Sequence, residues 1–235
     1  YGQDLGQPDG LPDLLSAICG AVPELDWLRV MYAFPGHVSD RLIATMAELP
    51  PVCSYVDIPL QHGHPDVLRR MRRPSDPQAV MDLVQRLRTA MPDIALRSAM
   101  IVGFPGETDA EFESLLDFLE DLAFDKVGVF AFSPEEGTAA AQMPGQVPPE
   151  RIAERYRQAM ELQQGISQSG NDRQVGRTLP VLIDGANDGL SVGRTYRDAP
   201  EIDGLVLIAE ELPVGELVRA RIIEAQPYDL VAEPV

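Results

Sequence analysis

The first two thirds of the chain alternate between apolar runs rich in β-branched residues and longer stretches whose apolar residues recur at helical spacing. The apolar runs cover residues 27–32, 53–58, 94–102 and 126–132, and loops with Gly or Pro separate them from the helical stretches. Most runs are apolar on consecutive residues, which is typical of parallel strands covered on both faces. This order predicts an α/β fold with four parallel strands connected by helices.

Capping residues mark the helices of this part. Thr108 and Glu111 have the spacing of a capping box ahead of an apolar stripe. A helix that ends at Gly20 is expected early in the chain, and Pro-rich starts favour two later ones. The expected helices cover residues 11–19, 39–49, 77–91, 109–122 and 149–166.

A second fold is expected beyond Gly170, where the helical period disappears. Short apolar runs at 178–183, 190–195, 205–209, 215–225 and 228–232 are separated by turn residues, and residues 185–189 predict a hairpin turn. Five strands in about sixty residues favour a small closed antiparallel barrel of the OB type. We therefore expect one domain at residues 1–170 and a second at 171–235.

Charge and cysteine content restrict the function. Lys and Arg number 19 against 37 Asp and Glu, a net charge of −18, which opposes nucleic acid and favours basic partners. The two cysteines, Cys19 and Cys53, form no Cys-x-x-Cys pair, which argues against a disulfide scaffold or a metal site and favours the cytoplasm. No apolar run reaches the roughly 20 residues of a membrane-spanning helix. The start at Tyr1, without Met, indicates a piece of a longer chain.

Loops at the carboxyl ends of parallel strands are where ligands bind in such folds. Gln61 and His62 follow the second strand, and they either contact a ligand or cap backbone groups. Val102 and Gly103 end the third strand, where Gly allows a close approach and a helix start offers N–H groups. A tight turn that requires Gly for its geometry is the alternative.

Two further charged groups have similar alternatives. Glu135 and Glu136 follow the fourth strand and either position a basic substrate or are solvated loop acids. The basic cluster of residues 69–73 contains four arginines, which either bind a phosphate or carboxylate or make partner contacts and internal salt bridges. No metal ligand set is expected, and no catalytic residue is assigned.

Several separated strings together resemble the radical S-adenosylmethionine (SAM) methylthiotransferases, and within them the RimO type. Residues 55–62 read Tyr-Val-Asp-Ile-Pro-Leu-Gln-His and are followed by Met-Arg-Arg-Pro at 71–74. Residues 101–108 read Ile-Val-Gly-Phe-Pro-Gly-Glu-Thr, and residues 133–138 read Ser-Pro-Glu-Glu-Gly-Thr. Residues 198–204 resemble the RimO form of a TRAM domain. The resemblance covers nearly the whole chain.

This resemblance implies the last four units of a six-unit parallel (β/α) barrel, followed by a TRAM barrel. It implies a transferase of sulfur-containing groups that adds a methylthio group to the β-carbon of an aspartate in a small-subunit ribosomal protein, the one numbered twelve. The implied cofactors are SAM and two 4Fe-4S clusters. By position, Gln61, His62, Val102 and Gly103 are expected to line the SAM side of the barrel.

The departures from the family pattern matter equally. The family's Cys-x-x-x-Cys-x-x-Cys loop is not in this chain, so the chain alone is predicted to be inactive. A tRNA-modifying enzyme of the MiaB type is the alternative within the family. A non-catalytic, ribosome-associated binding module is the alternative of another class. From Asn171 onward six arginines face twelve carboxylates, a net charge of −6, which favours a basic protein over RNA.

Overall fold

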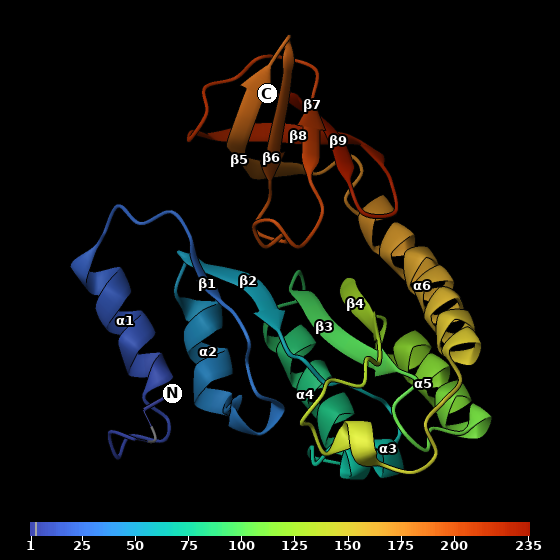
Figure 1. Ribbon diagram of the computed structural model, residues 1–235. Coiled ribbons are helices and arrows are strands. Elements are labelled where there is room, and N and C mark those ends of the chain that lie inside the picture. Colours follow the sequence, from blue (N-terminus) through green and yellow to red (C-terminus); the bar gives the residue numbers. More distant parts are fainter. Residues whose placement is uncertain (3) are drawn as a thin grey trace.

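A parallel sheet of four strands forms the first part of the computed structural model, which describes residues 1–2 and 4–235. The strands follow one another in space in the order β1-β2-β3-β4 (Figure 1). Their bounds are β1 Leu28–Val30, β2 Val52–Asp57, β3 Ala95–Val102 and β4 Lys126–Ala131. The predicted alternation of strands and helices is confirmed.

The helices pack on one face of this sheet and bury its main core. They are α1 Leu11–Ala21, α2 Asp40–Glu48, α3 Pro65–Arg70, α4 Pro77–Ala90, α5 Asp109–Leu122 and α6 Pro149–Asp172, with 3-10 turns at Pro35–His37 and Ala140–Gln142. Leu96 and Met100 of β3 lie fully buried in this core with Leu115 and Leu119 of α5. Burial of this apolar surface is the main stabilising term of the first part.

Local sequence explains most helix boundaries, with two exceptions. The capping box at Thr108 is present, with the Glu111 side chain accepting from the Thr108 N–H at 2.8 Å. Gly20 lies inside α1 rather than after it, because Gly tolerates helical backbone as well as a turn. The short helix α3 is absent from the expected set, since six residues are too few to show a helical period.

The second part is a closed barrel of five strands: β5 Thr178–Asn187, β6 Leu190–Arg194, β7 Val206–Ile208, β8 Leu217–Ala225 and β9 Leu230–Pro234. They pair in the order β5-β6-β7-β9-β8, and β8 closes the ring on β5. One pairing, β7 with β9, is parallel rather than antiparallel. A closed ring with an odd number of strands cannot alternate in direction throughout, so one parallel pair is required.

Helix α6 connects the two parts, and a loop of the barrel returns to the sheet. Residues 195–205, between β6 and β7, descend from the barrel as an orange loop toward the strands (Figure 1). Ala199 of this loop packs in a small apolar cluster with Cys53, Tyr55 and Ala95 of the sheet. The barrel therefore covers part of the sheet face that the helices leave open. Among the described residues, no helix has the length and apolar character needed to cross a membrane.

Candidate functional site

The sheet face opposite the helices, called the inner face below, carries a buried ionic network. Arg97 donates from Nη1 to Asp57 Oδ1 at 3.0 Å and from Nε to Asp203 Oδ1 at 3.2 Å. Asp203 belongs to the β6–β7 loop, and its Oδ2 accepts from the Tyr55 hydroxyl at 2.7 Å. Burial raises the pKa of Asp57 even though the Arg97 charge acts in the opposite direction. The network ties the barrel to the centre of the sheet.

Two adjoining cavities lie at the carboxyl ends of the strands. The inner cavity has a volume of about 620 Å³, and Tyr32, Gln61, Arg73, Arg97, Phe130 and Ile202 are among its lining residues. The rim cavity has about 500 Å³ and shares Gln61, Arg73 and Ile101 with the inner cavity. Both sizes suit a small-molecule ligand or a side chain. Because Ile202 comes from the β6–β7 loop, the barrel contributes directly to the inner cavity.

Gln61 is the predicted site residue that faces these cavities. Its N–H donates to the Ala99 carbonyl at 2.8 Å, and its carbonyl accepts from the Ile101 N–H at 2.7 Å. This extends the pairing with β3 beyond the end of β2, and the φ of Gln61 is 77°. A positive φ is uncommon for a residue other than Gly. The local backbone therefore fixes the Gln61 side chain between the two cavities.

His62 lies behind Gln61 and lines neither cavity. Its ring is buried, and Nδ1 accepts from the His64 N–H at 2.9 Å. With Nδ1 as acceptor, the proton of a neutral ring belongs on Nε2, which lies 3.7 Å from Oε2 of Glu107. His62 thus holds the loop from within, which is the capping alternative of the sequence analysis.

The turn at Gly103 satisfies its own N–H groups. Oε2 of Glu107 accepts from the N–H of Gly103 at 2.8 Å and from that of Phe104 at 3.3 Å. A Cβ at Gly103, whose φ is 79°, would lie 2.5 Å from the Ile152 side chain. Val102 is fully buried in the helix-side core. The chain's own carboxylate therefore occupies the N–H groups of Gly103 and Phe104, which lie ahead of the helix start that was expected to offer donors to a ligand.

At the start of α5, Glu111 and Thr108 satisfy each other's backbone N–H groups. Arg70 donates to both carboxylate oxygens of Glu111, at 3.0 and 2.9 Å. Burial raises the pKa of Glu111, but the hydrogen bonds from Arg70 and Thr108 and the Arg70 charge outweigh burial and lower it to about 2. Glu111 is therefore an ionised structural group rather than an acid or base for catalysis.

The acidic loop after β4 and the basic cluster differ in their surroundings. Glu135 and Glu136 are exposed, and no described residue forms an ion pair with either carboxylate. Of the four arginines, Arg69 pairs with Asp66 and Arg70 with Glu111. The other two, residues 72 and 73, are exposed and line the cavities.

The chain's cysteines do not fit an iron-sulfur cluster, which is held by several thiolates that converge on one point. Cys53 is buried under the β6–β7 loop, where burial raises the pKa of its thiol, and Cys19 belongs to α1. His64, Asp66 and Glu111 offer donor atoms within 4.8 Å of one another. His64 Nδ1 already accepts from the Asp66 N–H at 3.2 Å, and Glu111 is held by Arg70. We assign no metal to this group.

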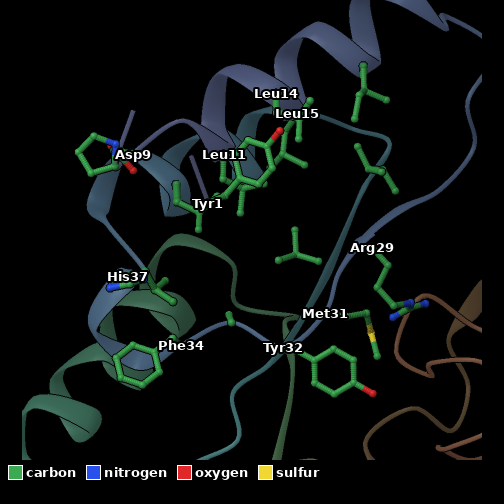
Figure 2. A pocket seen from close by; sticks show the side chains of 17 residues that line it. Tyr1, Asp9, Leu11, Leu14, Leu15, Arg29, Met31, Tyr32, Phe34 and His37 are labelled. Atoms are coloured by element: carbon green, nitrogen blue, oxygen red, sulfur yellow. The ribbon is translucent and has the colours of Figure 1, made fainter. Parts of the chain in front are cut away.

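A third cavity, of about 410 Å³, lies between α1, α2 and β1 and is mostly apolar. In Figure 2, Leu11, Leu14 and Leu15 of α1 line one side of it. Arg29 points away from α1 in the same view, toward the second domain, where it donates to the Tyr196 carbonyl at 2.7 Å. Asp9, Arg29 and His37 are also among its lining residues, and it shares Tyr32, Ala33 and Phe34 with the inner cavity.

The network residues were not identified from the sequence. Asp57 and Arg97 are charged residues within apolar strand runs, and that irregularity is a signal that could have revealed them. Asp203 gave no such signal, because it stands among the ordinary acidic residues of a polar loop. Its partner Arg97 is 106 residues away in the sequence.

Family models agree with the two parts of the structure. Residues 5–119 match the model of the radical SAM superfamily, and residues 175–235 match that of the TRAM domain. Coproporphyrinogen III oxidase (HemN) from Escherichia coli, described as a radical SAM enzyme, has a similar structure, with a TM-score of 0.53 over 67% of this chain and 37% of that chain. Its sequence identity is 16%, so this likeness concerns the fold alone.

Curated relatives are similar over essentially the whole chain. The ribosomal protein uS12 methylthiotransferase RimO of Chloroflexus aurantiacus is 51% identical over 99% of this chain and 52% of its own length. Those of a Roseiflexus species and of a Synechocystis species are 52% and 46% identical, over 100% and 98% of this chain and 51% and 52% of their own lengths. The chain thus spans about half the length of the curated relatives it matches.

The fold and the family models define a radical SAM protein whose sheet is followed by a TRAM domain. Within that class, the chain belongs to the RimO-type methylthiotransferases.

Proposed function

We propose that this chain is the sheet and substrate-recognition part of an enzyme that transfers a methylthio group to the β-carbon of an aspartate in ribosomal protein uS12. The identity of about half of all residues to proteins named for that activity, across both domains, carries the proposal. The inner cavity, built jointly by the sheet and the β6–β7 loop, supports it. The acidic charge of the chain opposes the RNA substrate of the MiaB-type alternative.

SAM and 4Fe-4S clusters are the cofactors that the family implies, and reductive cleavage of SAM would supply the radical. The cluster ligands would not come from Cys19 and Cys53, so we derive no step through a cluster. The inner cavity is large enough for part of SAM, and Gln61 is the residue best placed to orient it with its side-chain amide. His62, Val102 and Gly103 would then act from behind, by holding the loops that form the cavity wall.

The acidic TRAM domain supports a basic protein partner. Its net charge of −6 from Asn171 onward, within a chain of net charge −18, attracts a basic ribosomal protein and repels the phosphates of RNA. We accordingly place the protein in the cytoplasm, beside the ribosome. A non-catalytic binding module would share this surface, so binding and cofactor tests are both needed.

The test is binding of purified uS12 and of tRNA to the 235-residue chain at several salt concentrations. We expect uS12 to bind, and to bind more weakly as salt rises, because screening removes long-range attraction. Replacing two exposed barrel acids, Glu210→Lys with Glu211→Lys, should weaken uS12 binding by about tenfold.

The matched control makes the same charge change on the exposed face of α5, as Asp117→Lys with Glu120→Lys. This variant should bind uS12 within about twofold of the unchanged chain, because the barrel surface is untouched. Tight tRNA binding, or uS12 binding that does not depend on salt, would contradict the proposed partner.

A further inference from the structure

The two carboxyl-end cavities are basic in a strongly acidic chain. The residues lining the inner and rim cavities include four arginines, at positions 70, 72, 73 and 97, and no Asp or Glu. The whole chain has 37 acidic and 19 basic residues. A cavity free of carboxylates therefore stands out against the composition, and it points to an anionic ligand.

The pairing of these arginines shows where the uncompensated charge lies. Arg70 is neutralised by Glu111, and Arg97 by Asp57 and Asp203. Among the residues that the structure describes, no carboxylate forms an ion pair with Arg72 or Arg73. The net positive charge of the cavities therefore comes from these two exposed side chains, of which Arg73 lines both cavities and Arg72 the rim cavity.

The backbone holds both arginines at this position. The helix α3 ends at Arg70, and the N–H groups of Arg72 and Arg73 donate to the carbonyls of Arg69 and Leu68 at 3.0 and 2.8 Å. Arg72 has a φ of 56°, in the left-handed region that costs a residue with a side chain about 1 kcal/mol. Pro74 then prevents the helix from continuing. The chain therefore bends sharply where the two guanidinium groups reach the cavities.

A donor of Arg97, the Gln61 amide and an apolar wall complete the environment. Arg97 uses Nε and Nη1 for its two carboxylates, and the described residues leave its Nη2 without a hydrogen-bond partner beside the inner cavity. Gln61 adds a side-chain amide shared by both cavities. Ile101 and Phe104 provide apolar wall, which suits a charged group on an aliphatic carrier better than a polyphosphate.

We propose that the inner and rim cavities form one carboxylate-binding site, in which Arg73 and Arg72 bind the side-chain carboxylate of the uS12 aspartate. The planar guanidinium fork matches a carboxylate in two hydrogen bonds, and the site would orient the adjacent β-carbon toward the inner cavity. The assignment of the bound carboxylate to the uS12 aspartate rests on the proposed function. The anion site itself rests only on the cavities and their charges.

The decisive experiment is a double-mutant cycle between this chain and purified uS12. We expect Arg73→Gln to weaken uS12 binding by about tenfold or more, and Arg73→Lys to weaken it less, because Lys keeps the charge but loses the fork. uS12 with its target aspartate replaced by asparagine should bind the unchanged chain with a similar loss. Combining the two changes should add little further loss, since both remove one interaction. Fully additive losses would overturn the proposal.

Arg69→Gln is the matched control: it removes the same charge four residues earlier in the chain, from the last turn of α3, where Arg69 pairs with Asp66 outside the cavities. Its uS12 affinity should stay within about twofold of that of the unchanged chain. If Arg69→Gln lost as much uS12 affinity as Arg73→Gln, the loss would reflect the net charge of the chain and not a specific site, and the proposal would be overturned.

Binding of small ligands tests the anion site independently of the proposed function. Succinate should shift amide signals of residues around Gln61 and Arg73 in NMR spectra, and Arg73→Gln should abolish those shifts. If succinate binds in this way but uS12 does not bind at all, the proposed function fails and the anion site stands. If SAM affinity falls in Arg73→Gln while uS12 affinity does not, the carboxylate belongs to SAM and the assignment to the uS12 aspartate is overturned. Stronger shifts with inorganic phosphate than with succinate would overturn the preference for a carboxylate.

Discussion

At the scale of single residues, the turn at Gly103 shows a carboxylate placed where an external anion would otherwise bind. Glu107 accepts from the N–H groups of Gly103 and Phe104, and Arg155 donates to it at 2.9 Å from α6. The Glu107 carboxylate is thus held by two backbone N–H groups and one arginine side chain, all of them from this chain. The effect of a substitution at Gly103 should therefore depend on steric fit and not on the loss of a ligand contact.

We predict that Gly103→Ala destabilises the fold by about 2 kcal/mol, because the new Cβ meets Ile152 and the backbone is left-handed. Gly165→Ala is the control, since Gly165 lies within α6 with no atom near an added Cβ, and it should stabilise by about 0.5–1 kcal/mol. Urea denaturation of both variants measures the difference. If both variants changed the free energy of unfolding by the same amount in the same direction, this account of the turn would be wrong.

At the scale of elements, the β6–β7 loop connects the barrel with the inner face. Asp203 accepts from Tyr55 and Arg97 in the sheet and from the N–H of Ala199 at 2.9 Å within the loop. One carboxylate therefore fixes the loop's own turn and its docking together. Ile202, its neighbour, is placed at the inner cavity by the same contacts.

Asp203→Asn should release this loop. The amide carries no charge for Arg97, so we expect a loss of about 1–3 kcal/mol and amide exchange at least about tenfold faster in residues 196–204. Hydrogen exchange detected by mass spectrometry reports this directly. Glu201→Gln, an exposed change on the same loop, should leave the exchange pattern intact. Unchanged exchange in Asp203→Asn would show that apolar packing alone docks the loop.

At the scale of the whole molecule, buried ion pairs join the sheet and the barrel. Arg197 of the barrel donates to Asp125 at 2.6 Å, and both side chains are at most 10% exposed. Lys126 pairs with Asp198 at 2.9 Å close by. Separation of the two parts would break these pairs, the Arg97–Asp203 pair and the apolar contacts of Ala199 together, so the two parts are coupled.

We therefore predict a single thermal unfolding transition for both parts. Arg197→Gln should lower its midpoint by about 6–20 °C, since breaking a buried pair costs about 3–5 kcal/mol and each kcal/mol lowers the midpoint by about 2–4 °C in a protein of this size. Arg221→Gln, which breaks an exposed pair with Glu233 inside the barrel, should lower it by no more than about 2 °C. Calorimetry gives the transitions, and fluorescence of Trp27 reports on the interface. Two separate transitions in the unchanged chain would contradict the coupling.

Prediction from sequence succeeded where the information is local. The strands begin and end within a few residues of the expected runs, and the Thr108 capping box formed as its spacing indicated. It was incomplete for the barrel, where β7 and β9 pair in parallel, because the direction of a pairing depends on how the ring closes. The assignment of Gln61, His62, Val102 and Gly103 to SAM stays a prediction, with Gln61 alone of the four at the cavities.

By itself the sequence determined the order and type of all the strands and of the longer helices, and it indicated the family, because these depend on patterns within segments of the chain. Only the tertiary structure decided which loop side chains face the cavities, which arginines stay unpaired and that Asp203 reaches Arg97. Residues 106 positions apart meet through packing of the intervening elements, and no local pattern encodes that meeting.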